Sequence, residues 1–228
     1  MNFKEIVEMA KAHEIEETGD QFCDFRTQKM LDDSRWYGNK IEPYYSFFYK
    51  LSNYLKPKVV VELGGWRGDS AAHFARGTEG TVITIDHHTD PDDDKNTKAM
   101  IEVVENCPNV YFIKGWTVGK VAEEQRGKHA LGDAGSAFPE VKKILDGRKI
   151  DLLFIDSWHR YDYAKIDWEA YSPLLSDEAL VICDDIVGGS SENDPISGMR
   201  DFWDELPGEK ELIDNLHVGY PMGLLYYA

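Results

Sequence analysis

The chain has 228 residues, enough for one α/β domain with a full hydrophobic core. It carries 25 Lys and Arg against 42 Asp and Glu, a formal net charge of −17. This acidity argues against binding to nucleic acid or to an anionic membrane, and no apolar run approaches the roughly 18 residues of a membrane span. A charged N-terminus unlike a signal peptide, and three cysteines without C-x-x-C spacing, predict a reducing, cytoplasmic location without disulfides.

The N-terminal quarter is predicted to be helical. Residues 3–17 have the pattern of a charged amphipathic helix, and the aromatic-rich residues 43–56 form a second helix that Pro57 ends. We expect residues 1–56 to form a helical lid or substrate-binding segment in front of a main domain of residues 57–228.

From residue 58 onward, strand and helix signals alternate. The central strand candidates are nearly all apolar, as in parallel strands that are covered on both faces. The predicted strands are 58–63, 81–86, 110–114, 151–155 and 179–183, and the predicted helices are 69–76, 95–106, 137–146, 160–171 and 196–206. This alternation predicts an α/β fold with a doubly wound, Rossmann-like, seven-stranded and mostly parallel sheet, with helices on both faces.

Two further segments complete the predicted organisation. Residues 214–227 hold two short apolar runs around Gly219-Tyr220-Pro221, which predicts a C-terminal antiparallel hairpin. Residues 117–136 are Gly-rich and charged with little periodicity, which is typical of a surface insertion and is compatible with part of a lid.

The most informative stretch is residues 59–70, Val-Val-Val-Glu-Leu-Gly-Gly-Trp-Arg-Gly-Asp-Ser. It reads as a strand, a tight turn and the start of a helix near Ser70. Its glycines let the backbone pass close to a ligand, and the helix presents free N–H groups there. The order Glu-x-Gly-x-x-x-Gly differs from the dinucleotide fingerprint, and Glu62 would repel a diphosphate but suits an ammonium group. The glycines are Gly64, Gly65 and Gly68.

In open α/β sheets the ligand lies beyond the carboxyl ends of the strands, so the residues after each strand matter most. Asp86 ends the second predicted strand, 24 residues after Glu62, where a carboxylate accepts both hydroxyls of a ribose. After the third strand, Gly115 permits close approach, and Trp116 either stacks on an adenine or packs in the core. His87-His88 could form a transition-metal site, although the acidic residues at 90–94 favour a solvated loop.

Three carboxylates follow the fourth and fifth predicted strands. The fourth ends in Asp156-Ser157-Trp158-His159 and the fifth in Asp184-Asp185, so adjacent strands would bring the carboxylates together. Because such groups repel and are costly to bury unpaired, a divalent cation between them is expected. All-oxygen ligation favours Mg²⁺ or Ca²⁺, with Mn²⁺ as a further candidate. Alternatively, one carboxylate caps a helix or pairs with Arg160 or Arg200.

The glycine turn resembles motif I of the class I S-adenosylmethionine (SAM) methyltransferases. With the acidic triad, residues 55–187 resemble the metal-dependent O-methyltransferases of that superfamily, both the catechol and caffeoyl-CoA type and the bacterial enzymes that methylate macrolide sugars. The catechol type has a Lys after the fourth-strand Asp, whereas this chain has Trp158-His159-Arg160. The Asp-x-x-His run is similar to the sugar-methylating branch. The resemblance implies metal ligation by Asp156, Asp184 and Asp185, SAM contacts from Glu62, Gly64, Gly65, Gly68, Ser70, Asp86, His87, Gly115, Trp116 and Asp156, and catalysis by His159 with Asp156.

Together these features predict metal-assisted methyl transfer from SAM to a hydroxyl, in particular a vicinal diol, of a small molecule such as a sugar or natural product. Two rivals remain: a metal-independent SAM methyltransferase with another acceptor, and a non-catalytic SAM- or nucleotide-binding module. A homo-oligomer is compatible with the sequence. His159 could instead cap the following helix or hydrogen-bond Asp156. The candidate walls of the acceptor pocket are Tyr44, Tyr45, Phe48 and Trp158, although the aromatic run 44–49 is expected first of all to pack in the core.

Overall fold

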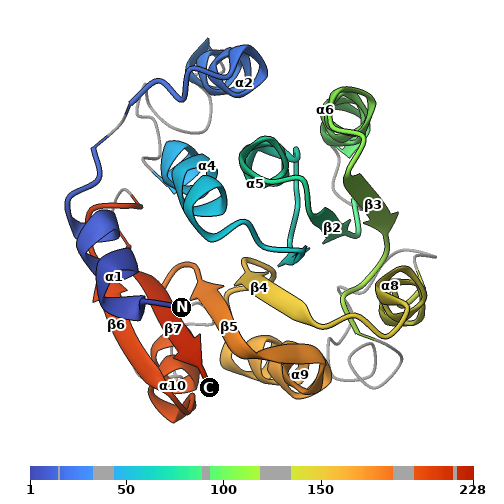
Figure 1. Ribbon diagram of the computed structural model, residues 1–228. Coiled ribbons are helices and arrows are strands. Elements are labelled where there is room, and N and C mark those ends of the chain that lie inside the picture. The colour runs from blue at the N-terminus through green and yellow to red at the C-terminus, as the bar shows by residue number, and fades with distance from the viewer. Residues whose placement is uncertain (15, 33–43, 89–92, 119–134, 187–197, 218–219) are drawn as a thin grey trace.

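The computed structural model describes residues 1–14, 16–32, 44–88, 93–118, 135–186, 198–217 and 220–228 (Figure 1). Within these residues, seven strands form one sheet in the order β3-β2-β1-β4-β5-β7-β6. The strands are β1 (Val59–Leu63), β2 (Thr81–Asp86), β3 (Val110–Lys114), β4 (Ile150–Ile155), β5 (Leu175–Cys183), β6 (Glu209–Ile213) and β7 (Met222–Tyr227). Strands β1 to β5 pair in parallel, and β7 pairs antiparallel with β5 and β6. The predicted doubly wound, mostly parallel sheet is confirmed.

Helices cover both faces of this sheet (Figure 1). On one face lie α4 (Tyr44–Leu55), α5 (Asp69–Gly77) and α6 (Asp93–Asn106), with α1 (Phe3–Lys11) beside β6 and α2 (Gln21–Asp32) packed on α5. The opposite face carries α8 (Phe138–Leu145), α9 (Tyr161–Tyr171) and α10 (Gly198–Glu205). Among the described helices, none combines the length and the apolar character that crossing a bilayer requires.

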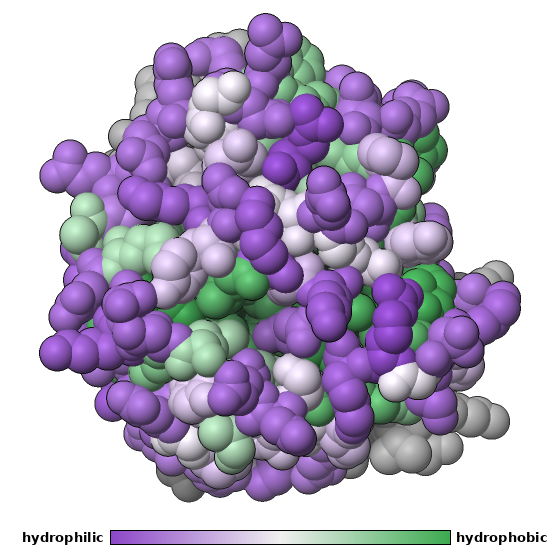
Figure 2. Space-filling view, viewed as in Figure 1, coloured by the Kyte–Doolittle hydropathy of each residue, from purple (hydrophilic) through white to green (hydrophobic). Residues whose placement is uncertain are grey.

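Each face of the sheet has its own hydrophobic core. Phe48 and Phe74 stack at 4.3 Å between ring centroids on one side, and Phe202 and Trp203 pack on the other. Every residue of β1 is buried, because α4 and α5 cover one side of that strand and the second core covers the other. Burying one such large apolar side chain stabilises the fold by roughly 1.5–3 kcal/mol. In contrast, Figure 2 shows a surface on which hydrophilic side chains predominate, in keeping with the charged composition.

The N-terminal segment differs from its prediction in two ways. Helix α1 ends at Lys11 rather than at residue 17, because the following Glu-rich residues would lie at the negative C-terminal end of the helix. Helix α2 was not predicted. Asp20 begins it, since its Oδ1 accepts hydrogen bonds from the backbone N–H groups of Phe22 at 3.0 Å and Cys23 at 3.1 Å.

The N-terminal helices are part of the main hydrophobic core. Phe3 and Ile6 of α1 share one buried cluster with Phe47 and Leu51 of α4 and with residues of the sheet. The first 56 residues therefore contribute to the same core as the sheet, and the division of the chain at residues 56 and 57 stays a prediction.

The C-terminal pair of strands begins earlier than predicted. Strand β6 spans residues 209–213, before the expected segment 214–227, whereas β7 lies inside it. The charged sequence of β6 concealed it, because an edge strand tolerates such residues on its solvent side. The predicted lid falls mostly on residues 119–134, which lie outside the described part of the chain. Its two ends are adjacent, since Trp116 forms a β-bridge with Ser136.

The three cysteines agree with the predicted lack of disulfides. Cys23, Cys107 and Cys183 all carry free thiols, and all three are buried. Burial raises the pKa of the Cys107 thiol to about 11, so this group stays protonated near neutral pH.

Candidate active site

The glycine turn after β1 lies directly against the end of β4. Gly64 has φ +98°, and a Cβ built on it would lie 2.1 Å from the backbone oxygen of Asp156. The N–H groups of Gly64 and Gly65 both donate to the carbonyl of Ile85 at 2.9 Å. Gly68, with φ +80°, precedes the first residue of α5. The predicted strand, turn and helix are therefore present, and the turn has no room for a side chain at Gly64.

Glu62 supports this turn from behind. Its carboxylate is fully buried and accepts hydrogen bonds from the hydroxyls of Ser70 and Thr84, the latter at 2.6 Å. Burial raises the pKa of Glu62 to about 7, although those two hydrogen bonds act in the opposite direction. Glu62 does not line the cavity beside the turn, whereas Ser70 does. A direct contact between Glu62 and the cofactor stays a prediction.

Asp86 joins the glycine turn to the segment after β2. Its carboxylate accepts hydrogen bonds from the backbone N–H groups of Trp66 at 2.7 Å and His88 at 3.0 Å. Next to it, the rings of His87 and Trp116 lie 4.3 Å apart, and Trp116 is buried. The N–H of Gly115 donates to the carbonyl of Asp86 at 2.9 Å. These predicted cofactor residues thus gather at the carboxyl ends of the parallel strands, and their contacts with SAM stay predictions.

His88 is a structural residue rather than a metal ligand. Its Nδ1 lies 2.8 Å from the Thr97 hydroxyl, and its Nε2 lies 2.6 Å from the Trp66 carbonyl oxygen. The side chain is buried, so the prediction of a solvated loop is wrong at this residue. Within the described residues, the groups able to hold a metal do not include the His87-His88 pair.

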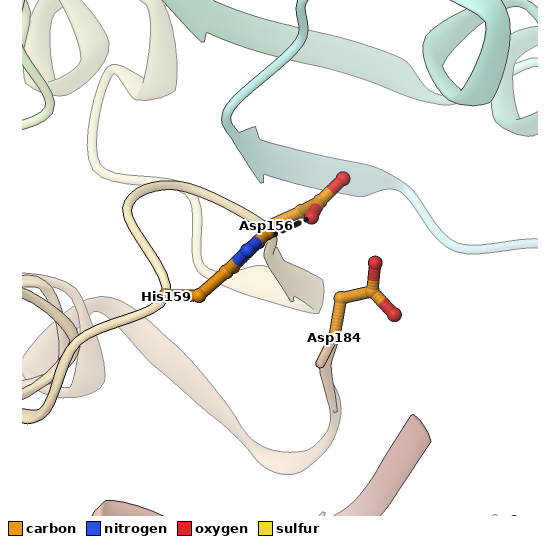
Figure 3. A group of neighbouring side chains, drawn as sticks. All are labelled: Asp156, His159 and Asp184. Atoms are coloured by element: carbon orange, nitrogen blue, oxygen red, sulfur yellow. Dashed lines mark hydrogen bonds and ion pairs between the residues drawn. The ribbon is translucent and has the colours of Figure 1, made fainter. Parts of the chain in front are cut away.

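Acidic and imidazole side chains converge at the ends of β4 and β5 (Figure 3). His159 Nε2 lies 3.0 Å from Asp156 Oδ1, and His159 Nδ1 lies 2.8 Å from Asp185 Oδ2. Asp184 points toward the same space from β5. The structure therefore brings together the three carboxylates that the strand ends predict.

His217 is a member of this cluster that we did not predict. Its Nδ1 lies 2.9 Å from Asp184 Oδ1 and 3.1 Å from Asp185 Oδ1. The residue lies between β6 and β7. Because β7 runs antiparallel to β5, with Cys183 opposite Gly223, this connection reaches the edge where the parallel strands end. The sequence signal for His217 was its place in the turn of the predicted C-terminal hairpin, because an antiparallel neighbour of β5 brings that turn to the carboxyl ends of the parallel strands.

The cluster perturbs the protonation of its members. Burial and the neighbouring charge of Asp184 raise the pKa of Asp156 well above its usual range. Burial opposes ionisation of Asp185 and His159 as well. Nevertheless, their mutual hydrogen bond lowers the pKa of Asp185, and the bonds to Asp156 and Asp185 raise the pKa of His159 well above its usual range. The two carboxylates therefore favour the protonated form of His159.

Of the alternative roles considered for these residues, the hydrogen bond between His159 and Asp156 is present, at 3.0 Å, whereas the pairing with arginine and the helix cap are not. Arg160 pairs with Asp162 at 3.2 Å and Arg200 with Asp204 at 3.2 Å, not with the cluster. Helix α9 begins after Arg160, which makes no side-chain capping bond, so His159 is not the cap.

One cavity of about 240 Å³ joins the glycine turn to the cluster. Tyr44 and Tyr45 line it as predicted, with a hydrogen bond of 3.0 Å between their hydroxyls. Phe48 does not line it, because its ring is fully buried against Phe74 and Phe154, which is the packing role that the sequence also predicted. The other residues that line the cavity are Gly64, Gly65, Trp66, Arg67, Asp69, Ser70, Asp156, His159, Asp184, Asp185 and His217.

Trp158 was also predicted to wall the pocket, and it lies outside the cavity. It is 43% exposed and stacks on Tyr163 with ring centroids 5.2 Å apart.

Asp167 on α9 is another residue that we did not predict, and it supports the loops around the site. It accepts hydrogen bonds from the hydroxyls of Ser157, at 2.7 Å, and Thr117, and so holds the segments after β4 and β3 together.

Comparisons with known proteins identify the family to which this chain belongs. Residues 61–186, more than half of the chain, match the family model described as a methyltransferase domain, and the chain belongs to that family. It is a class I SAM-dependent methyltransferase. No curated protein matches the chain.

Solved structures show the same fold at low sequence identity. An O-methyltransferase from Bacillus cereus in complex with SAH has a TM-score of 0.63 at 14% identity and covers 99% of this chain and 97% of its own. A putative caffeoyl-CoA O-methyltransferase from Staphylococcus aureus has a TM-score of 0.63 at 16% identity, covering 100% and 99%. The O-methyltransferase TomG from Streptomyces achromogenes, involved in tomaymycin synthesis and solved with SAM, has a TM-score of 0.58 at 14% identity, covering 100% and 97%.

Proposed function

We propose that this methyltransferase transfers the methyl group of SAM to a hydroxyl oxygen of a small molecule, with the help of a divalent ion held by Asp156, Asp184 and Asp185. The observation that carries the proposal is that the glycine turn and the carboxylate cluster line one and the same cavity. A methyl donor on the turn would lie beside an acceptor held at the cluster.

The glycine turn supports the assignment of the donor. Gly64 and Gly65 leave backbone exposed to the cavity, and the hydroxyl of Ser70 lies at the start of α5, where free N–H groups favour an anionic group such as a carboxylate. Asp86 is the candidate partner of the ribose hydroxyls. SAM and SAH are the ligands named for several proteins of the same fold.

The donor set fits a hard or borderline divalent ion. Asp185 Oδ1 is buried and accepts no hydrogen bond from the described residues, and an ion beside it would remove the cost of that buried charge. Ligand atoms of Asp156, His159 and Asp184, and likewise of Asp184, Asp185 and His217, lie within 4.8 Å of one another. Mg²⁺, Ca²⁺ or Mn²⁺ there would supply Lewis acidity toward a bound hydroxyl.

The chain's own residues then position and deprotonate the acceptor. Tyr44 and Tyr45 limit the cavity on one side, which favours a small acceptor such as a sugar or natural product with neighbouring hydroxyls. His159 lines the same cavity and is the candidate proton acceptor. An ion bound to Asp156 and Asp185 would neutralise the two carboxylates that raise the pKa of His159, and would so favour its neutral, basic form. Holding the two reacting atoms in line is expected to provide much of the rate enhancement.

A metal-independent methyltransferase is the second candidate. One observation favours it: His159 and His217 between them lie within hydrogen-bond distance of all three carboxylates, so the cluster has imidazole partners without an ion. Transfer of labelled methyl from SAM to a panel of vicinal diols, with EDTA and then with added Mg²⁺ or Mn²⁺, separates the two. We expect chelation to abolish transfer and metal to restore it, whereas full activity in EDTA would support the second candidate. A module that binds SAM without turnover on any acceptor would be non-catalytic.

A further inference from the structure

We propose that His217 is a nitrogen ligand of the metal ion, beside Asp184 and Asp185, and that the site therefore binds Mn²⁺, Fe²⁺ or Co²⁺ more tightly than Mg²⁺. This proposal rests on the metal-assisted function proposed above. It changes the predicted ligand set from oxygen alone to oxygen with imidazole, and with it the class of ion.

The spacing of the ligand atoms supports the role of His217. Its Nδ1 lies 2.9 Å from Asp184 Oδ1 and 3.1 Å from Asp185 Oδ1. Two adjacent ligands of an octahedral ion, each about 2.1 Å from it, lie about 3.0 Å apart. His217 Nδ1 therefore lies at the distance from each carboxylate oxygen that two adjacent ligands of one ion have, and the three ligand atoms all lie within 4.8 Å of one another.

Geometry alone leaves a second interpretation, in which His217 only donates a hydrogen bond to Asp184. In that case Asp185 Oδ1, which lies 3.1 Å from the same nitrogen, is left without a hydrogen bond although it is buried. One imidazole nitrogen carries a single proton and satisfies one carboxylate oxygen only. An ion that binds the nitrogen and both oxygens would satisfy all three atoms.

The surroundings of His217 fix its ring. The rings of Tyr44 and Tyr220 each pack edge-on against the His217 ring, and in both pairs the ring centroids lie 5.7 Å apart. The side chain of His217 is 15% exposed and lines the cavity. A ligand held in this way loses little conformational entropy when it binds an ion.

The chemical class of the ion follows from the imidazole. Mg²⁺ prefers carboxylates, carbonyls and water, whereas imidazole suits transition-row ions, whose affinities for a given nitrogen-containing site rise from Mn²⁺ through Fe²⁺ to Co²⁺. Two carboxylates with one imidazole on one face also leave positions open for acceptor hydroxyls, as a catalytic site needs.

Pulsed electron paramagnetic resonance of the full chain with bound Mn²⁺ tests the proposal. A directly bound imidazole nitrogen modulates the Mn²⁺ echo. We expect this modulation in the native chain and in His159→Ala, and its loss in His217→Ala and His217→Asn. Modulation that survives in both His217 variants, or disappears in His159→Ala alone, would overturn the proposal. Bound Mn²⁺ without any nitrogen modulation would also overturn it, yet would leave the metal-assisted function standing.

Calorimetric titration provides the second measurement. We expect His217→Asn to weaken Co²⁺ binding by at least about 10–100-fold, because this is the loss when only a partner of a metal ligand is removed and His217 is proposed as a ligand itself. The variant keeps a polar side chain beside Asp184. Mg²⁺ affinity should change by less than about threefold, because Mg²⁺ gains little from imidazole. Equal losses for both ions would contradict the proposal. If neither ion bound the native chain, the metal-assisted function itself would fail.

Discussion

Arg26 of α2 donates a hydrogen bond from Nε to Asp69 Oδ1 at 2.7 Å, so a fully buried ion pair joins the N-terminal helices to the first residue of α5. The same guanidinium reaches the carbonyl of Arg67 at 2.8 Å and the carboxylate of Glu102 at 3.0 Å. Arg67 and Asp69 both line the cavity. Arg26 therefore holds the backbone of the glycine turn in place, although Arg26 itself does not line the cavity.

Replacing Arg26 with Met should destabilise the fold strongly. Asp69 would remain buried without its partner, and breaking a buried pair in this way costs about 3–5 kcal/mol. Urea denaturation measures the change. Lys29→Met is the matched control, because Lys29 makes a half-exposed pair with Glu102 at 2.7 Å and should cost no more than about 1 kcal/mol. Equal effects of the two substitutions would show that the buried pair contributes nothing special.

Glu62 should make the fold less stable as the pH rises. Burial raises its pKa to about 7, from 4.5 for an ordinary Glu, so the folded chain binds this proton more tightly than the unfolded chain. Its contribution to stability is therefore present below pH 4.5 and is lost as the pH rises through 7, by about 3 kcal/mol. Glu62→Gln should remove this loss.

The measurement is the difference in unfolding free energy between the native chain and Glu62→Gln at pH 5 and at pH 8. We expect the variant to gain stability relative to the native chain at the higher pH. Glu140→Gln, at an exposed position on α8, controls for the general change in charge. A difference that does not depend on pH would refute a raised pKa at Glu62.

Gly64→Ala should disrupt the turn. An added Cβ would lie 2.1 Å from a backbone oxygen, which no side-chain rotation can relieve, so we expect a loss above the 1–3 kcal/mol typical of overpacking. Gly147 is the matched control, since it also has positive φ, +79°, but nothing lies within 4 Å of an added Cβ. Gly147→Ala should cost only about 1–2 kcal/mol, for the left-handed backbone. Comparable thermal unfolding of both variants would contradict the close approach at Gly64.

His159→Ala should lower kcat by about 10²–10⁴-fold, the usual contribution of a general base. Part of the activity should return at alkaline pH, where the acceptor hydroxyl ionises more readily. Single-turnover rates at saturating metal and SAM measure the effect. Trp158→Ala controls for disturbance of the loop, because Trp158 is exposed and lies outside the cavity. Equal rates for the two variants would remove His159 from the reaction.

Much of the fold was predictable because its signals are local. The five parallel strands are short apolar runs bounded by turn residues, and their carboxyl ends place Asp156, Asp184 and Asp185 at one edge of the sheet. The glycine turn was equally clear, since its residue types are those that a left-handed backbone and a close approach require.

The missing parts depend on contacts that are distant in sequence. Helix α2 has no clear amphipathic pattern, because its polar Arg26 is buried by ion pairs rather than exposed. His217 follows no parallel strand and reaches the cluster only because β7 runs antiparallel to β5. The hydrogen bonds that Glu62 accepts from the hydroxyls of Ser70 and Thr84 also depend on the fold, whereas its contact with the cofactor stays a prediction.

The central claim is that one cavity holds both the methyl donor and a divalent ion. A crystal of the chain grown with SAH and Mn²⁺, measured at a wavelength where manganese scatters anomalously, tests it most directly. The account predicts SAH on the glycine turn, and an anomalous peak about 2.0–2.6 Å from carboxylate oxygens of Asp156, Asp184 and Asp185. SAH bound on the turn with no anomalous peak at these carboxylates would contradict it.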